Sequence, residues 1–375
     1  KLTYIKNTFE NAKEIGSLLL VDAYDYLSLI NKIREDNNLF NSSMVDKLES
    51  LLKVAYILQK KYDVVVTNPP YMSQSYMPTH LKSYLNKFYL ISKNDLCTAF
   101  MNSSLVTKLG YLGMITQQSW MFLSSFENLR KNIIENKNIV CMLQFGSHAF
   151  EEIGGEVVQT TSFIIQNKET NDKSIFFRLV NYDDAKTKER KFLEINNNKL
   201  NDYYLKEQNE FLKIPGCPIA YWISNRYIKI FEQNERLANK ANVKQGLATG
   251  DNNRFLREWY EVNINNTLLN PKSIEELKIS SVKWFPYNKG GEFRKWYGNN
   301  DFVVDWKDDG KTIKNLRDFN GNLKSRPQNT NFYFNESITW SKISSSSISF
   351  RYKPFGHIFD VAGTSIFSNK ENLIY

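Results

Sequence analysis

The sequence predicts an α/β protein that is followed by a second domain of different build. Three observations support this fold class. The β-branched run Tyr62–Thr67 stops at the breaker Asn68-Pro69-Pro70, which is typical of a fully buried parallel strand. Apolar periodicity then alternates between helix and strand to about residue 180. Beyond about residue 240, aromatic, basic and glycine residues are interleaved without a long helical period, and 375 residues are enough for two domains.

Residues 1–60 are predicted to be helical, because apolar side chains recur at helical spacing. The two series that show this spacing are Phe9, Ala12, Ile15 and Leu19, and then Val45, Leu48, Leu52, Ala55 and Leu58.

Helices and strands are predicted to alternate between residues 95 and 180. One helix is expected from Asp95, whose charge suits a helix N-terminus, to Leu109, with Gly110 ending it. Another is expected from its N-cap Ser125 to Ile134. Strands are expected at 111–116, 139–145, 157–166 and 174–180. This order favours helices packed on a mostly parallel sheet.

We divide the chain into a first domain at 1–200, a charged helical connector at 201–240, and a mixed α+β domain at 241–375. The chain does not begin with Met, and it ends on the apolar pair Ile374-Tyr375. We therefore expect it to be part of a longer protein, with its last domain truncated.

The composition favours some classes of protein over others. Lys and Arg number 49 against 40 Asp and Glu, a net charge of +9 with a pI near 9.1. This balance suits nucleic acid, although a solvated basic surface explains it equally well. Cys97, Cys141 and Cys217 lack metal or disulfide spacing. Without a long apolar run or a signal peptide, we expect a cytoplasmic protein that has no membrane partner and no metal.

Asn68-Pro69-Pro70-Tyr71 is the motif with the clearest chemistry. An exocyclic amine such as adenine N6 is a poor nucleophile, because its lone pair is delocalised into the ring. The Asn68 carboxamide oxygen and the rigidly held Pro69 carbonyl can accept hydrogen bonds from its two N–H groups and free that lone pair. The Tyr71 ring offers a flat face to a base taken out of the duplex. An ordinary Pro-Pro turn is the alternative, but chance gives this tetrapeptide in only roughly one such chain in a thousand.

These four residues resemble the catalytic motif of amino methyltransferases of the γ type. Further stretches follow in that family's order at Asp95–Phe100, Gly110–Trp120, His148–Val157 and Gly246–Asn252. The resemblance implies that Phe100 lies against the adenine of S-adenosylmethionine, although a core position is an equally good interpretation. It also implies that Phe150 helps to hold a flipped adenine.

The resemblance implies a partial, Rossmann-like S-adenosylmethionine-dependent methyltransferase domain at 1–200 and a DNA target-recognition domain at 241–375. The implied reaction is methyl transfer to adenine N6 in duplex DNA after base flipping. The likeness is greater to the PglX family of BREX phage-defence systems, which implies other defence proteins as partners. The stretches that carry it are Gly250–Phe255, Pro286–Gly291, Phe350–Tyr352 and Phe359–Gly363.

The chain departs from the family's pattern at the cofactor site. A glycine-rich cofactor loop precedes the family's catalytic motif, whereas Gly16 is the only glycine before Asn68. Asp22 is the candidate for the family's acidic cofactor contact, and Asn68 is expected to contact the cofactor as well. We expect the chain alone to lack half of the pocket and to be inactive.

Basic residues beside aromatic residues and glycines are the predicted DNA contacts of the second domain. They are Lys283, Lys289, Arg294, Lys295 and Arg351. Lys and Arg suit phosphates and guanine edges. A solvated surface explains any one of them better, but the cluster favours DNA.

Three alternatives stay open. A bifunctional restriction-modification enzyme needs a nuclease module that is not visible in this sequence. A protein methyltransferase acting on glutamine can use the same tetrapeptide, although the long basic and aromatic C-terminal part argues against it. A DNA-binding specificity module without catalysis would not need Asn68.

Overall fold

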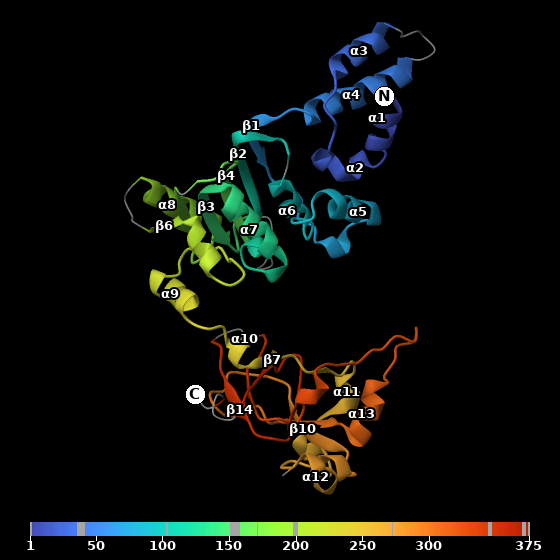
Figure 1. The fold of residues 1–375 in the computed structure, drawn as a ribbon, viewed down its shortest axis with the longest axis vertical. Helices are drawn as coiled ribbons and strands as arrows, with labels where there is room; N and C mark the ends of the chain where they lie inside the picture. Colours follow the sequence, from blue (N-terminus) through green and yellow to red (C-terminus); the bar gives the residue numbers. More distant parts are fainter. Residues whose placement is uncertain are drawn as a thin grey trace. The chain divides into compact units, whose positions relative to one another are not determined.

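The computed structural model divides into two compact units, Lys1–Asn234 (unit 1) and Glu235–Tyr375 (unit 2), shown in Figure 1. The residues that it describes are 2–35, 42–102, 104–150, 158–170, 172–197, 202–271, 273–343, 347–369 and 373. Within these ranges, no helix is long and apolar enough to cross a membrane. The boundary between the units lies inside the stretch 201–240.

Unit 1 is an α/β unit built on one six-stranded sheet. Its helices are α1 (Leu2–Phe9), α2 (Ala12–Ile15), α3 (Tyr26–Glu35), α4 (Ser42–Leu58), α5 (Thr79–Phe88), α6 (Leu96–Met101), α7 (Glu127–Asn136), α8 (Ala185–Asn196) and α9 (Asn225–Gln233). Its strands are β1 (Tyr62–Thr67), β2 (Val106–Gln117), β3 (Asn138–Gly146), β4 (Thr160–Gln166), β5 (Lys173–Arg178) and β6 (Tyr203–Glu207), in the order β1-β2-β4-β3-β5-β6. The sheet is mixed rather than mostly parallel, because β4 runs against both of its neighbours and β6 runs against β5.

Three predicted elements differ from the structure. The helix expected at 95–109 ends at Met101, and Gly110 lies inside β2. A β-carbon on Gly110 would lie 2.9 Å from the carbonyl oxygen of Asp63, where the register of β1 and β2 shifts, so this glycine permits a bulge. The expected N-cap Ser125 instead lies in a 3-10 turn before α7. The stretch 201–240 begins with β6, which pairs with β5, before its helices α9 and α10 (Leu237–Lys240).

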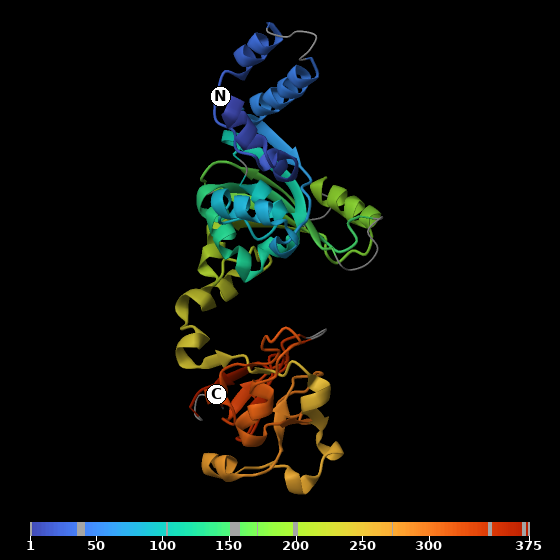
Figure 2. The ribbon, with the colours of Figure 1, turned by 90° about the vertical axis from the view of Figure 1, so that its right-hand side faces the viewer.

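The first 58 residues are helical where the structure describes them. Helices α1, α3 and α4 pack around Ile5, Tyr26, Ile30 and Leu52, and Figures 1 and 2 show them as a group beside the β1 end of the sheet. Helix α4 leads almost directly into β1. The strand that leads to the Asn68 motif therefore begins a few residues after a packed helix.

Helix α7 covers one face of the sheet. Its residues Leu129 and Ile133 pack in the main core of unit 1 with Met142 of β3, Phe163 of β4 and Phe176 of β5. Alternate residues along each strand point to this core, as expected for strands with period two.

The opposite face is only partly covered. Helix α8 packs on it through Phe192 and Ile195, near the ends of β3 and β5. Directly paired residues of all six strands form a line across this face, which we call the apolar row: Val66, Gly113, Ile164, Cys141, Ile175 and Leu205. Val66 is 78% exposed and Ile164 is 40% exposed.

The prediction that Tyr62–Thr67 is a fully buried strand is wrong. Strand β1 is parallel to β2, as expected, but it is an edge strand of the sheet. Val64 and Val66 are both exposed on the second face. Apolarity alone indicates that a strand can be buried, but not that the chain itself provides the cover.

Unit 2 consists of short strands and short helices, in the pattern of a mixed α+β fold. Its helices are α10, α11 (Asn252–Phe255), α12 (Ile274–Ile279) and α13 (Lys307–Lys314). Its strands are β7 (Asn242–Lys244), β8 (Leu247–Ala248), β9 (Leu256–Glu258), β10 (Trp284–Asn288), β11 (Phe302–Asp305), β12 (Arg326–Pro327), β13 (Ser337–Thr339), β14 (Arg351–Lys353), β15 (Ile358–Phe359) and β16 (Ser365–Phe367). They form sheets of order β15-β10-β11-β9, β14-β13-β16-β7 and β12-β8.

The core of unit 2 requires a glycine at position 246. A β-carbon there would lie 1.7 Å from the carbonyl oxygen of Phe359, so no other residue fits without moving β15. Close by, the hydroxyl of buried Tyr287 donates to Asp360 Oδ2 at 2.5 Å. The Gly246–Asn252 stretch is therefore explained at least partly by packing.

The two faces of the unit 1 sheet should differ in their sensitivity to truncation. We expect Phe163→Ala, at a side chain only 1% exposed, to lower the free energy of unfolding by about 3–5 kcal/mol. Val66→Ala should change it by no more than about 0.5 kcal/mol. Urea denaturation of the two variants measures both values, and equal losses would contradict an open second face.

Candidate functional site

The carboxyl ends of β1, β2, β3 and β5 lie along one edge of the sheet, because these four strands run in the same direction. Asn68–Tyr71 follow β1, Gln117 ends β2, and Phe150 lies four residues beyond β3. Strands β1 and β3 are three positions apart, about 14 Å at the usual spacing. Such an edge is where open α/β sheets hold ligands.

Asn68 is exposed at this edge, directly after β1. In the part of the chain that the structure describes, no residue forms a hydrogen bond with its carboxamide. Pro69 behind it is buried and Pro70 is exposed. The amide is therefore free to bind a molecule from solution, while its backbone is restricted by two proline rings.

Tyr71 is half-buried, and its hydroxyl oxygen is buried with no hydrogen-bond partner among the described residues. Burial, with a smaller contribution from Cys97, raises the pKa of Tyr71 to about 12. The hydroxyl therefore stays protonated near neutral pH. What Tyr71 can offer to a ligand is its ring.

Asp95 fixes the loop that follows Tyr71 to the N-terminus of α6. Its buried carboxylate oxygen Oδ1 accepts hydrogen bonds from the backbone N–H of Cys97 at 3.0 Å and of Met72 at 3.4 Å. The N–H of Leu96 donates to the Met72 carbonyl at 2.9 Å, and the N–H of Gln74 donates to the Asn94 carbonyl at 3.0 Å. Helix capping and loop anchoring are thus done by the same side chain.

Phe100 lies on α6, one turn beyond this anchor. It is half-buried and packs against both the main core and the cluster that joins α2, α5 and α6. A partly exposed ring suits the adenine of S-adenosylmethionine, and a free amide such as that of Asn68 suits its polar groups. The rest of such a site is not matched, because Gly16 opens a 3-10 turn and a β-carbon there would meet nothing within 4 Å.

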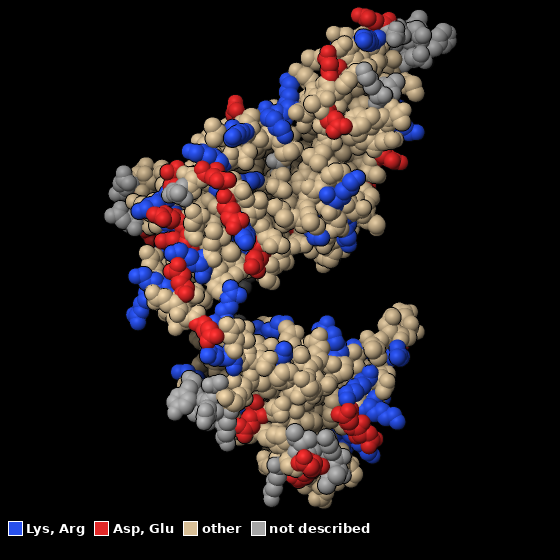
Figure 3. Space-filling model, in the orientation of Figure 1, with Lys and Arg blue, Asp and Glu red and all other residues tan. Residues whose placement is uncertain are grey.

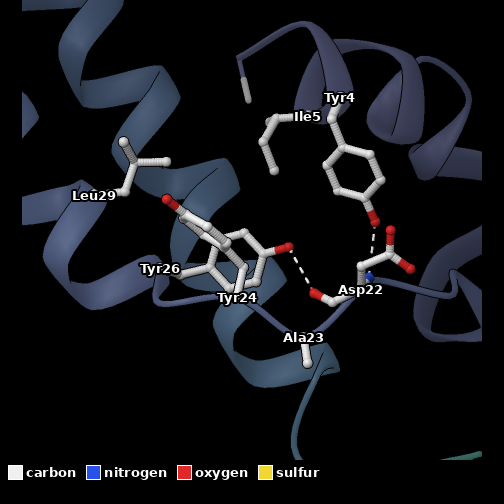
Figure 4. Close-up of a pocket in the computed structure, with 7 residues that line it drawn as sticks. All are labelled: Tyr4, Ile5, Asp22, Ala23, Tyr24, Tyr26 and Leu29. Atoms are coloured by element: carbon white, nitrogen blue, oxygen red, sulfur yellow. Dashed lines mark hydrogen bonds between the residues drawn. The ribbon is translucent and has the colours of Figure 1, made fainter.

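Asp22 lies between the helices of the N-terminal group. Its N–H donates to the Tyr4 hydroxyl at 2.8 Å, and its carbonyl accepts from the Tyr26 hydroxyl at 2.9 Å, as Figure 4 shows. It lines a cavity of about 260 Å³ together with the apolar and aromatic residues Tyr4, Ile5, Ala23, Tyr24, Tyr26 and Leu29. No hydrogen bond or ion pair between described residues joins it to Asn68. The described hydrogen bonds of Asp22 are thus with residues of α1 and α3.

Phe150 is half-buried on the loop after β3, close behind the left-handed residue His148. Topology brings this loop to the same sheet edge as Tyr71. Residues 151–157 of the predicted base-holding segment lie outside the described residues.

The predicted DNA contacts of unit 2 do not form one cluster. Lys283 precedes β10 and Lys289 follows it, so a strand length of about 20 Å separates them. Lys283 forms an ion pair with Asp305 at 3.5 Å. Arg294 and Lys295 are exposed near Lys289 in sequence. Figure 3 shows that acidic residues are interspersed with basic ones on each unit.

Arg351 does not agree with its predicted role as a DNA contact. The whole residue is 0% exposed. Its guanidinium donates to the Ser349 hydroxyl at 3.0 Å and to the Arg294 carbonyl at 3.4 Å. Arg351 lies beneath exposed Arg294 and supports that residue's backbone. Alternate residues of a strand face opposite sides of the sheet. A sequence pattern of basic and aromatic residues does not tell which of these sides is buried.

A chain of amide side chains at the sheet edge was not anticipated from the sequence. Buried Gln144 donates to Gln118 Oε1 at 2.9 Å and accepts from the Tyr221 hydroxyl at 2.6 Å, and Gln118 donates to Gln159. These residues are too far apart in sequence for spacing to reveal them. The only available signal was polar Gln144 near the end of an apolar strand. Across the described ranges, no three His, Cys, Asp or Glu side chains are grouped to hold a metal ion.

Comparison with known proteins finds a matching family model within unit 1 and relatives that extend over both units. Residues 2–150 match the Eco57I restriction-modification methylase family. The chain is 41% identical over 386 residues to the adenine-specific methyltransferase PglX of Lacticaseibacillus casei (strain Zhang), covering 98% of this chain and 32% of the relative. It is 38% identical to the adenine-specific methyltransferase BrxX of Escherichia coli O9:H4 (strain HS), covering 98% of this chain and 30% of the relative.

The chain is therefore similar over nearly its whole length to PglX and BrxX proteins. It spans about a third of the length of the PglX and BrxX proteins that it matches, and the matched part includes both units. Among solved structures, the Type IIL restriction-modification enzyme MmeI in complex with DNA aligns over 83% of this chain and 41% of that chain, at 13% identity and a TM-score of 0.49. A likeness at this score does not establish a common fold.

Removing the Asp95 carboxylate should loosen the loop that follows Tyr71 as well as α6. We expect Asp95→Ala to lower the free energy of unfolding by about 0.5–2 kcal/mol, the usual loss for an N-cap. It should also speed hydrogen exchange at the Met72 amide, measured by mass spectrometry or NMR. Asp184, which caps α8 through the Thr187 N–H at 2.8 Å, is the matched control. Asp184→Ala should leave exchange at Met72 unchanged, and unchanged exchange in Asp95→Ala would contradict the anchor.

Proposed function

We propose that the chain carries the catalytic loop and a DNA-recognition unit of an adenine-N6-specific DNA methyltransferase that uses S-adenosylmethionine. One observation carries the proposal: Asn68, first residue of an Asn-Pro-Pro-Tyr loop at the carboxyl end of β1, presents an exposed carboxamide without a described hydrogen-bond partner. The family relationship supports the same assignment, since PglX and BrxX are described as adenine-specific methyltransferases.

Asn68 and Pro69 would activate the amine by accepting its two hydrogens. The Asn68 Oδ1 and the Pro69 carbonyl oxygen are neutral acceptors, so they polarise the N–H bonds without first removing a proton. As both hydrogen bonds form, the nitrogen lone pair leaves conjugation with the ring. The extra proton can leave after attack, so no general base is required. Rigid placement of the two acceptors accounts for most of the catalysis.

Phe100 would form the apolar wall for the cofactor's adenine, and Asn68 and Asp22 would be its polar contacts. S-Adenosylmethionine, when bound, supplies the electrophilic methyl group. Phe100 suits this position because its ring is only partly used by the two clusters that it joins. Asp22 is the least supported of the three, because its described hydrogen bonds are with Tyr4 and Tyr26.

Tyr71 and Phe150 would hold the target adenine once it is flipped out of the duplex. The buried hydroxyl of Tyr71 leaves its ring to stack on the base. Phe150 lies on a loop of the same sheet edge and is half-exposed, as a second stacking face requires. Flipping is needed because the amine of a paired adenine cannot reach a loop at the protein surface.

Unit 2 would hold the duplex through Lys289, Arg294 and Lys295, with Lys283 at a second position. These contacts would be to phosphates and base edges. Arg351 would contribute indirectly, because it holds the backbone of Arg294 in place. We further propose that the longer protein works with other proteins of a BREX phage-defence system in the cytoplasm, where genomic and phage DNA are accessible.

Asn68→Ala in the longer protein should reduce methyl transfer to duplex DNA by roughly 100-fold or more, as loss of a preorganised hydrogen-bonding group does. DNA affinity and thermal stability should change little, because Asn68 is exposed and makes no contact within the described fold. Incorporation of labelled methyl groups into oligonucleotides measures the effect. Asn136→Ala, an exposed asparagine at the end of α7, is the control. Near-normal activity of Asn68→Ala would refute the proposal.

The 375-residue chain by itself should bind S-adenosylmethionine weakly or not at all. The reason is that its described residues match only one wall of the cofactor site, at Phe100 and Asn68. Isothermal titration calorimetry tests this expectation directly. A micromolar dissociation constant would show that the chain holds a complete cofactor site.

A further inference from the structure

The connection between β10 and β11 exposes an unusual set of aromatic side chains. We call residues 289–300 the aromatic loop. Within it Phe293 is 49% exposed, and Trp296 and Tyr297 are each 71% exposed. Phe350, itself exposed, lies next to Trp296, since its carbonyl accepts the Trp296 N–H at 2.8 Å. Large exposed apolar groups of this kind mark interaction sites.

The backbone of the aromatic loop is held in a conformation that bulky residues rarely adopt. Trp296 has a φ of 69°, in the left-handed region. Its N–H and its carbonyl are both bound to β14 and its flank, the carbonyl accepting from the Tyr352 N–H at 3.0 Å. The fold thus keeps a strained tryptophan pointing into solvent. Strain of this kind persists only where the surrounding structure holds it, and it clusters at functional sites.

Lys353 holds the C-terminal half of the aromatic loop from beneath. Its buried ammonium donates to the carbonyl oxygens of Gly298 at 2.8 Å and Asn299 at 3.0 Å, and also to the side chain of Asn300. Gly298 and Asn299 both have positive φ, so the ammonium binds the sharpest part of the turn.

Arg351 holds the N-terminal half of the same loop. It lies two residues before Lys353 on β14, so both side chains point to one side of the strand. Besides the Arg294 carbonyl, it donates to the Ser341 hydroxyl at 3.2 Å, and that hydroxyl donates to the Gly291 carbonyl at 2.6 Å. Two buried cations therefore support the exposed aromatic residues.

The charge of this region favours a polyanion. No described carboxylate lies within ion-pair distance of Arg351 or Lys353, and backbone carbonyls and hydroxyls are their partners. Burial, with a smaller contribution from Arg351, lowers the pKa of Lys353 to about 8, an effect that Asp301 opposes, so most of its charge remains at neutral pH. Arg294 and Lys295 add two exposed cations beside Trp296.

Unit 2 contains a second exposed Trp-Tyr pair in an opposite electrostatic setting. Trp259 and Tyr260 are 48% and 65% exposed, and Glu258 and Glu261 flank them. Aromatic exposure is therefore similar at the two places, while the sign of the neighbouring charges differs. This pair is an internal control for any role of the aromatic loop.

We propose that the aromatic loop contacts duplex DNA directly, with Trp296 and Tyr297 inserting between base steps from a groove while Arg294 and Lys295 bind phosphates. Arg351 and Lys353 are positioning residues that hold the loop from beneath. This inference rests on the proposed function, because it assumes that DNA is the partner of unit 2. Aromatic wedges flanked by cations are a known way to grip and bend a duplex.

The test measures binding of a DNA duplex to the 375-residue chain by fluorescence anisotropy, over a range of salt concentrations. Trp296→Ala/Tyr297→Ala should weaken binding about tenfold or more, since stacking on a base typically contributes at least this factor. The slope of log affinity against log salt should not change, because no charge is removed. Arg294→Gln/Lys295→Gln should instead reduce that slope by about two. Trp259→Ala/Tyr260→Ala should alter neither quantity.

Lys353→Met tests whether the buried ammonium of Lys353 holds the aromatic loop in its DNA-binding conformation. It should weaken DNA binding in the wild-type background but have no further effect when Trp296 and Tyr297 are already alanine. Additive losses would overturn the positioning role.

If Trp296→Ala/Tyr297→Ala bound duplex DNA with wild-type affinity, the proposed contact between the aromatic loop and DNA would be wrong. The loop would then be a candidate surface for a protein partner. That outcome would not touch the proposed function, which Asn68-dependent methylation tests separately. Absence of any duplex binding by the wild-type chain would also overturn the inference.

Discussion

The candidate active site depends on the carboxylate of Asp95. One oxygen of this side chain accepts the N–H of Cys97, which starts α6, and the N–H of Met72, which follows Tyr71. The loop that bears Asn68 follows an edge strand, and Asn68 and Pro70 in it are exposed. Because α6 also carries Phe100, this acceptor, together with the Leu96–Met72 and Gln74–Asn94 backbone hydrogen bonds, fixes the loop that bears Asn68 relative to the helix that bears Phe100. A site formed by a loop and a helix requires that the two be held together, and this matters more than deep burial of either one.

The sequence predicted local features well where a single strand or helix determines them. The strand before Asn68, the acidic N-cap of α6 and the helical pattern of Val45 to Leu58 are all present. Each depends on neighbours within a few residues, so spacing and capping chemistry suffice. The free Asn68 side chain follows from the same local cause, since two prolines stop the strand and turn the chain outward.

Features that depend on distant residues could not be predicted in this way. Gly110 reads as a helix terminator, but its role comes from the Asp63 carbonyl on a neighbouring strand. Arg351 reads as a DNA contact, whereas β14 buries it under Arg294. In both cases the residue type suits two environments, and tertiary structure selects between them. The PglX-family resemblance gave the order of the motifs but no information on which side chains are exposed.

The apolar row has a thermodynamic consequence for the amide that ends β1. Val66 is two residues before Asn68 on the same edge strand, with its side chain in water. A segment that covered Val66 would hold the end of β1, and any entropy lost there would not be lost again when a base bound the site proposed at Asn68. By reciprocity, an adenine at that proposed site would strengthen the covering contact. Assembly on one face of the sheet and substrate affinity at its edge would then be linked equilibria.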